Sequence, residues 1–153
     1  MIKYTFSSSN GPVTLISENE KIVQIILQSE EIHHDLPNKA CLQAEKEILE
    51  YFTNSRTEFT FPIEFSGSQF RKDVLRAMMK IPYGKTWNYS ELAKMSGHMG
   101  ADRAVGTVCK YNPLPLIIPC HRVVRKSGDI GEFYGGRSLK QLLLDIEKKP
   151  SKN

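Results

Sequence analysis

The hydrophobic pattern of the chain changes near residue 65, and this change limits the folds that the chain can adopt. Before it, short segments rich in Ile and Val are separated by turn-forming residues, as is typical of antiparallel β-strands; these segments are residues 2–6, 13–17 and 22–27. After it, apolar residues recur mostly at helical spacing. We therefore expect an α+β fold, with a small sheet-and-helix domain over residues 1–65 and a mostly helical domain over residues 66–153.

Charge is distributed unevenly between these two parts. Residues 1–65 hold 5 Lys and Arg against 10 Asp and Glu, whereas residues 66–153 hold 16 against 7. The formal net charge of the whole chain is only +4, which by itself decides nothing about partners. The split favours a polyanion as partner of the second part, against the alternative of a chance spread of solvated charge.

Two amphipathic helices are predicted from spacing and capping residues. One covers residues 40–53, with an apolar stripe formed by Leu42, Ile48, Leu49 and Phe52. The other begins at Ser66, which opens a Ser-x-x-Gln capping signal, and it stops at residues 82–84. Its apolar face consists of Phe70, Val74, Met78 and Ile81. Each helix should therefore cover one side of a core.

The basic part also contains a short helix, a glycine-containing turn and a second helix. Asn88 and Glu91 are spaced as a capping box for the first helix, Gly97 suits its end, and the second helix covers residues 101–111. This order is that of a helix-turn-helix, although many ordinary helix pairs look the same. The second helix would present one face to a partner, with Arg103, Gly106, Thr107 and Lys110. It would pack inward with Ala104, Val105, Val108 and Tyr111.

The residues around Cys120 carry the sharpest chemical signal. This cysteine ends an apolar run and precedes His121 and Arg122. Apolar surroundings raise the pKa of a thiol, whereas a neighbouring imidazole can accept its proton and Arg122 adds positive charge. The alternative is a buried cysteine that only packs, and we assign Cys41 and Cys109 to that role.

Several spaced motifs of the second part agree with one known family. The string Pro119-Cys120-His121-Arg122-Val123 resembles the active-site signature of the O6-alkylguanine-DNA alkyltransferases, also called methylated-DNA–protein-cysteine methyltransferases. Further segments follow the family order and spacing, namely residues 81–86, 89–93, 103–106 and 112–113, then Gly135, Gly136, Lys140, Leu143 and Glu147. The resemblance covers roughly residues 66–149, while residues 1–65 resemble the family only in size and strand–helix order.

This resemblance implies an enzyme that repairs O6-alkylguanine by moving the alkyl group onto its own cysteine, once per molecule. Cys120 would accept the alkyl group and His121 would withdraw the thiol proton through a water. Glu147 would stabilise the imidazolium that results, and Asn112 would help to hold the network. Tyr89 would donate a proton to N3 of the leaving base.

The resemblance also implies double-stranded DNA as partner, bound through its minor groove with the lesion base flipped out. Arg103 would fill the gap left in the base stack, and the other DNA contacts would come from Tyr89, Ala104, Gly106, Thr107 and Lys110. The base pocket would be formed by Pro119, Val123, Phe133, Tyr134 and Gly135. Phe133 and Tyr134 depart from the usual family pattern, and the bulk of Tyr134 predicts reduced tolerance for benzyl-sized adducts.

Three alternatives fit parts of the sequence. A non-catalytic binder of alkylated DNA that recruits other repair factors would share the fold, but such relatives lack the acceptor cysteine. A plain helix-turn-helix regulator would need neither Asn112 nor a Cys-His pair with a distant Glu. A thiol hydrolase would turn over, and the sequence offers no substrate loop for it.

No cofactor is expected. No metal is expected either, because the adjacent His33 and His34 lack a matching ligand set. No apolar run approaches the ~20 residues of a membrane span, so we expect no membrane contact. We also expect the protein to be a monomer. Three cysteines, an odd number, fit a reducing compartment better than a disulfide framework. The expected location is the cytoplasm of a prokaryote or the nucleus of a eukaryote.

Overall fold

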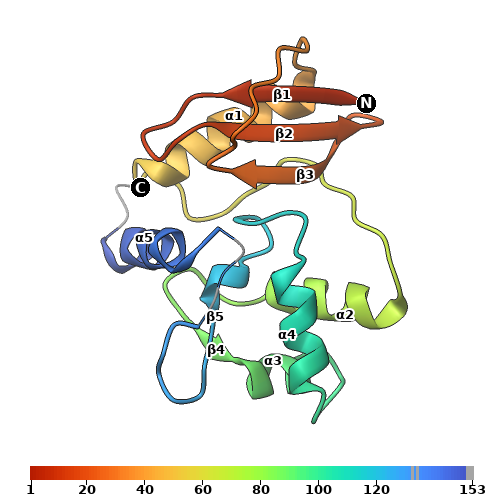
Figure 1. Cartoon of the computed structure of the whole chain (residues 1–153), viewed down its shortest axis with the longest axis vertical. Helices are drawn as coiled ribbons and strands as arrows, with labels where there is room; N and C mark the ends of the chain where they lie inside the picture. The colour runs from red at the N-terminus through yellow and green to blue at the C-terminus, as the bar shows by residue number, and fades with distance from the viewer. Residues whose placement is uncertain (132, 134, 151–153) are drawn as a thin grey trace. The chain divides into compact units, whose positions relative to one another are not determined.

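The computed structural model describes residues 1–131, 133 and 135–150, and they form two compact units (Figure 1). One unit contains residues 1–65 together with residues 149–150, and the other contains residues 66–148. The first holds an antiparallel sheet and one helix, and the second is mostly helical, which confirms the α+β class. None of the described helices is both long enough and apolar enough to span a membrane.

The first unit contains a three-stranded antiparallel sheet with the order β1–β2–β3 (Figure 1). Its strands agree with the predicted segments to within one residue at each end; they are β1 (Ile2–Phe6), β2 (Val13–Glu18) and β3 (Lys21–Leu27). Glu18 pairs with Lys21 across a two-residue loop in which Asn19 and Glu20 both have positive φ, 51° and 60°. Two left-handed residues give a hairpin loop whose twist matches that of the flanking strands.

The helix α1 (Lys39–Phe52) packs against β2 and β3 and begins at Asn38, whose Oδ1 accepts a hydrogen bond from the Cys41 amide at 2.9 Å. Its buried face differs from the predicted stripe and consists of Ala40, Cys41, Ala44, Glu47, Ile48 and Tyr51. Leu42 is 54% exposed, so its place in the stripe was wrong. Hydropathy could not place Glu47 inside, because a carboxylate is buried only where partners satisfy it, here the amide and hydroxyl of Thr60.

The second unit opens with α2 (Gln69–Met78) and continues with the helix-turn-helix pair α3 (Tyr89–Met95) and α4 (Asp102–Lys110). The cap of α2 is Ser68 rather than Ser66, since the Ser68 hydroxyl accepts from the Arg71 amide. The capping box of Asn88 and Glu91 on α3 is confirmed.

The inward face of α4 is narrower than its sequence predicts. Val105, Val108 and Cys109 are buried, whereas Ala104 is exposed and Tyr111 is 63% exposed. The helix ends at Lys110, so helical spacing no longer applies to Tyr111. The exposed side of α4 therefore extends further around the helix than expected.

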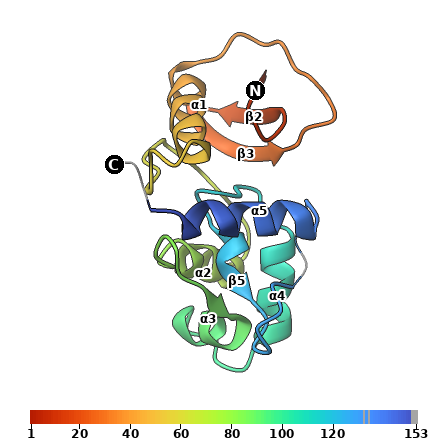
Figure 2. The same cartoon turned by 90° about the vertical axis from the view of Figure 1, so that its left-hand side faces the viewer.

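A short parallel pair that the sequence did not predict joins the helix-turn-helix to the segment around Cys120. The strand β4 (Trp87–Asn88) pairs with β5 (Val123–Val124), which follows the 3₁₀ turn η1 (Cys120–Arg122). The last helix, α5 (Arg137–Lys148), packs against η1 and lies in the same unit (Figure 2). This pairing brings the first residue of α3, Tyr89, close to the turn that carries Cys120.

Candidate active site

The backbone that presents Cys120 is held in a tight turn. Pro119 has φ −81° and ψ 68°, and the Cys120 amide donates to the Ile118 carbonyl at 2.8 Å, as in an inverse γ-turn. Asn112 braces this turn from within, because its Nδ2 donates to the same carbonyl at 2.7 Å and its Oδ1 accepts from the Leu114 amide at 3.0 Å. Asn112 therefore fixes the loop that leads to the thiol, which is itself buried.

A buried carboxylate on α5, that of Glu147, accepts hydrogen bonds from His121 and Arg122, the two residues that follow Cys120. Glu147 Oε2 accepts from His121 Nε2 at 2.6 Å, and its two oxygens accept from Arg122 Nε and Nη2 at 2.8 and 3.0 Å. The Gly84 amide adds a fourth hydrogen bond at 3.0 Å. Arg122 also donates from Nη1 to the Ile81 carbonyl. The sequence predicted that Arg122 adds positive charge near the thiol. In the structure Arg122 instead binds Glu147 and holds this carboxylate in place.

Burial and charge set the protonation of these groups. Burial raises the pKa of the Cys120 thiol to about 11, and the Asn112 hydrogen bond and the charge of Lys140 partly oppose that rise. Burial also lowers the pKa of His121, although the hydrogen bond and the charge of Glu147 act to raise it. Burial alone would raise the pKa of Glu147, but His121 and Arg122 outweigh it and hold this pKa well below its usual range. Near neutral pH the site therefore holds a thiol, a neutral imidazole and a carboxylate.

This protonation state fixes what the imidazole can do. Because Glu147 can only accept, the ring proton of His121 lies on Nε2 and the lone pair of the neutral ring lies on Nδ1. A neutral imidazole oriented by a carboxylate is the usual base for activating a thiol or hydroxyl nucleophile. Cys120, His121 and Glu147 thus have the order of nucleophile, base and orienting acid.

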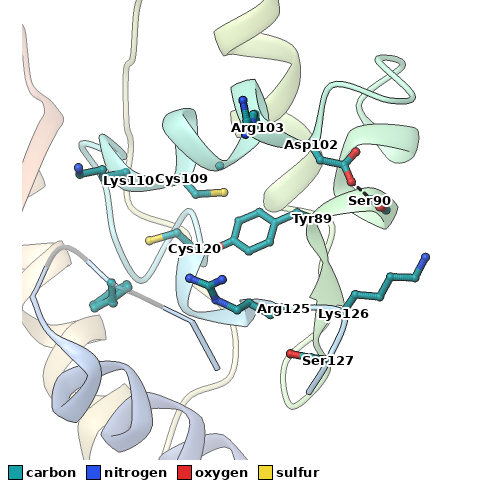
Figure 3. A pocket seen from close by; sticks show the side chains of 12 residues that line it. Tyr89, Ser90, Asp102, Arg103, Cys109, Lys110, Cys120, Arg125, Lys126 and Ser127 are labelled. Atoms are coloured by element: carbon teal, nitrogen blue, oxygen red, sulfur yellow. Dashed lines mark hydrogen bonds between the residues drawn. The ribbon is translucent and has the colours of Figure 1, made fainter. Parts of the chain in front are cut away.

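Cys120 also lines a cavity of about 750 Å³, into which side chains of α3 and α4 project (Figure 3). Six of the residues predicted for the site meet there: Tyr89, Arg103, Gly106, Lys110, Cys120 and Phe133. A Cβ atom on Gly106 would lie 3.8 Å from the Tyr89 ring, in ordinary van der Waals contact, so the backbone of α4 lies close to this ring. The cavity therefore joins the thiol to the outer face of α4.

The other predicted residues lie elsewhere in the second unit. Ala104 and Thr107 are exposed on α4, outside the described lining of this cavity, and Ala104 lines a shallower hollow with Met99 and Gly100. Pro119 and Val123 are buried, and Gly135 is exposed. Tyr134, the remaining residue predicted for the base pocket, lies outside the described residues.

Sequence reasoning missed several residues that line the cavity: Ser90, Asp102, Arg125, Lys126 and Ser127. The Ser90 hydroxyl donates to Asp102 Oδ2 at 2.5 Å, which ties α3 to α4 at the mouth of the cavity (Figure 3). Nothing local marks such a contact, because it joins residues on two helices. Within the described residues, no group of three or more His, Cys, Asp and Glu side chains could hold a metal ion.

Fold and site together define a helix-turn-helix protein in which a buried cysteine is followed by a histidine whose imidazole is oriented by a buried carboxylate. Residues 69–149 match the family described as "6-O-methylguanine DNA methyltransferase, DNA binding domain", and residues 1–65 match "6-O-methylguanine DNA methyltransferase, ribonuclease-like domain". The chain belongs to the 6-O-methylguanine DNA methyltransferase family, as its motifs around Cys120 indicate.

Individual relatives extend this likeness over both units. The methylated-DNA–protein-cysteine methyltransferase of Mycobacterium tuberculosis is 35% identical over 154 residues, which covers 97% of this chain and 93% of the relative. The inducible methylated-DNA–protein-cysteine methyltransferase of Bacillus subtilis is 43% identical over 105 residues. This match covers 69% of this chain and 59% of the Bacillus subtilis protein. A solved structure of Mycobacterium tuberculosis OGT in complex with DNA is 33% identical, with a TM-score of 0.87 and coverage of 97% and 93%.

Proposed function

We propose that this chain repairs O6-alkylguanine in double-stranded DNA by transferring the alkyl group to Cys120, once per molecule. Relatives along nearly the whole chain are methylated-DNA–protein-cysteine methyltransferases, and one solved relative holds DNA. The observations that carry the assignment to Cys120 are its position on an open cavity and the His121 residue that follows it, whose imidazole is bound by Glu147 at 2.6 Å. A helix-turn-helix regulator has no use for such a pair.

In the transfer, the Cys120 thiol loses its proton to Nδ1 of His121, directly or through a water. The sulfur attacks the alkyl carbon, and the S–C bond forms as the C–O6 bond breaks, so the bonding pair passes to the guanine. Tyr89 donates a proton to guanine N3, which neutralises the leaving base. Solvent then takes the proton from His121 and returns one to Tyr89. The product thioether has no route back to a thiol, which makes the protein a single-use acceptor.

The DNA contacts follow from the exposed side of α4. Arg103 is exposed at the mouth of the cavity, where its guanidinium fills the gap left by a flipped base. Gly106 lets the helix backbone approach a minor groove, and Ala104, Thr107 and Lys110 border that approach. Residues 66–153 bind DNA and accept the alkyl group, and residues 1–65 act as a scaffold. The protein works as a monomer.

The decisive experiment is a transfer assay on the intact protein. A duplex oligonucleotide with one O6-methylguanine is incubated with the protein. The protein is then digested, and the mass of the peptide that contains Cys120 is measured by mass spectrometry. We expect a gain of one methyl group on Cys120, and none in Cys120→Ser. Cys109→Ser is the matched control, since this thiol lines the same cavity and should be dispensable. An unmodified Cys120 peptide together with tight binding of the damaged duplex would favour the recruiting binder instead.

A further inference from the structure

Lys140 is a buried lysine that the mechanism above does not use. It lies on α5, is 1% exposed, and donates from Nζ to the Val123 carbonyl at 2.6 Å. The Val123 amide in turn donates to the Cys120 carbonyl, and α5 packs against η1, the turn that contains Cys120. The ammonium group therefore lies at the turn that carries the thiol.

Burying an ammonium group is unfavourable, so its place in the interior calls for an explanation. Burial lowers the pKa of Lys140, whereas negative charge on Cys120 and Cys109 raises it. The coupling is mutual, because the Lys140 charge lowers the pKa of Cys120 against the effect of burial. A thiolate at Cys120 and an ammonium at Lys140 therefore favour one another.

Before proton transfer, the imidazole–carboxylate pair supplies no net positive charge to the thiol. With His121 neutral, the charge of Glu147 is balanced by Arg122, which binds it through two hydrogen bonds, so the cluster is neutral before proton transfer. The other groups that act on Lys140 are Cys109 on α4, Arg125 after β5, and Arg137 at the start of α5. Arg125 and Arg137 are exposed, so solvent screens their charges, whereas the charge of Lys140 is shielded from water.

We propose that Lys140 is a positioning residue for the acceptor thiol. Its buried ammonium stabilises the Cys120 thiolate during attack, and its hydrogen bond to the Val123 carbonyl fixes the turn that aims the sulfur. His121 removes the proton, and Lys140 stabilises the charge that remains. The role rests on the proposed function in taking Cys120 as acceptor, but it concerns the ionisation of the thiol and can be tested without DNA.

The test measures the rate at which iodoacetamide alkylates Cys120 as a function of pH, read from the mass of the Cys120 peptide. Lys140→Met keeps the aliphatic stem and loses both charge and donor, Lys140→Gln keeps a donor without charge, and Lys140→Arg keeps the charge. The alkylation rate rises with pH between about pH 6 and about pH 10. In both neutral variants we expect this rise to move to higher pH by about one pH unit or more, which makes the reaction roughly tenfold slower at any one pH in this range. Lys140→Arg should restore most of the rate.

An unshifted pH dependence in Lys140→Gln would overturn the proposal, as would a slower rate at all pH values that Lys140→Arg fails to restore. The second result would indicate a purely structural role. If Lys140→Met does not fold, the test compares Lys140→Gln with Lys140→Arg. The methyl-transfer assay runs in parallel on the wild-type protein. If the pH dependence shifts in the Lys140 variants but the wild-type protein takes no methyl group from DNA, the proposed function is wrong and the role of Lys140 stands. If methyl transfer occurs but the pH dependence does not shift, the role of Lys140 is wrong and the proposed function stands.

Discussion

His121 and Glu147 are 26 residues apart in sequence and meet through a 2.6 Å hydrogen bond between Nε2 and Oε2, with both side chains buried. One belongs to the turn that carries Cys120, and the other lies near the end of α5. The imidazole is therefore oriented only while α5 is packed against that turn. The proposed activation of the thiol therefore depends on the packing of α5 against η1.

Replacing Glu147 by Gln should lower both transfer and stability. The buried Arg122 guanidinium would lose its carboxylate, and removing one partner of a buried ion pair costs about 3–5 kcal/mol of unfolding free energy. Urea unfolding at neutral pH measures that loss. Asp145→Asn is the matched control, because Asp145 lies exposed on the same helix and should change the unfolding free energy little.

The same carboxylate predicts how stability depends on pH. The pKa of Glu147 is lower in the folded protein than the value of about 4.3 expected in the unfolded chain, so its contribution is complete above that value. It is lost as the pH falls through the folded pKa. The wild-type unfolding free energy should thus decline on acidification below about pH 4, and that of Glu147→Gln should decline less. Parallel acid dependence in the two proteins would contradict this assignment.

Asn112→Ala should loosen the turn before Cys120. The Ile118 carbonyl and the Leu114 amide would each lose a buried partner, at a cost of about 1–3 kcal/mol for each unsatisfied group. The thiol would also lose the hydrogen bond that lowers its pKa, so its reaction with iodoacetamide should slow. Denaturant midpoints and peptide masses measure the two effects. Wild-type values for both would show that the brace has no role.

Tyr89→Phe should separate chemistry from binding. Loss of a general acid slows a reaction by about 10²-fold or more, whereas the aromatic ring remains in the cavity. Single-turnover transfer from an O6-methylguanine duplex should therefore be slower, with nearly unchanged affinity and unchanged iodoacetamide reactivity of Cys120. Tyr111→Phe, at an exposed tyrosine beyond the end of α4, should behave as wild type. Equal transfer rates for Tyr89→Phe and wild type would exclude the proton-donor role.

Lys110→Ala should weaken DNA binding without changing its sequence preference. Each lysine–phosphate contact contributes about one unit to the slope of log affinity against log salt concentration, so the slope should become shallower by about 1. Fluorescence anisotropy at several salt concentrations measures it. Lys46→Ala, an exposed lysine on α1 of the acidic unit, is the control and should leave the slope unchanged. A loss of affinity confined to one flanking sequence would indicate base reading by Lys110 instead.

Local sequence patterns sufficed where the determining interactions are local. The three strands and the capping box of Asn88 and Glu91 depend on neighbours in the chain, and each is found where it was predicted. Hydropathy failed at Leu42 and Glu47, because the face of α1 that meets the sheet also depends on small residues and on partners for a carboxylate. Periodicity alone would have placed Glu147 on the surface, near the end of a helix, and only the family motif argued for its role.

By itself, the sequence determined the class of the protein: an acidic strand-and-helix part, a basic helical part, and a cysteine with a base beside it. Only the tertiary structure decided how the residues of the proposed site are arranged. It placed Glu147 between His121 and Arg122, paired β4 with β5, and buried Lys140 at the turn that carries Cys120. The physical reason is that a charge can remain buried only when groups distant in the chain satisfy it, and packing alone brings those groups together.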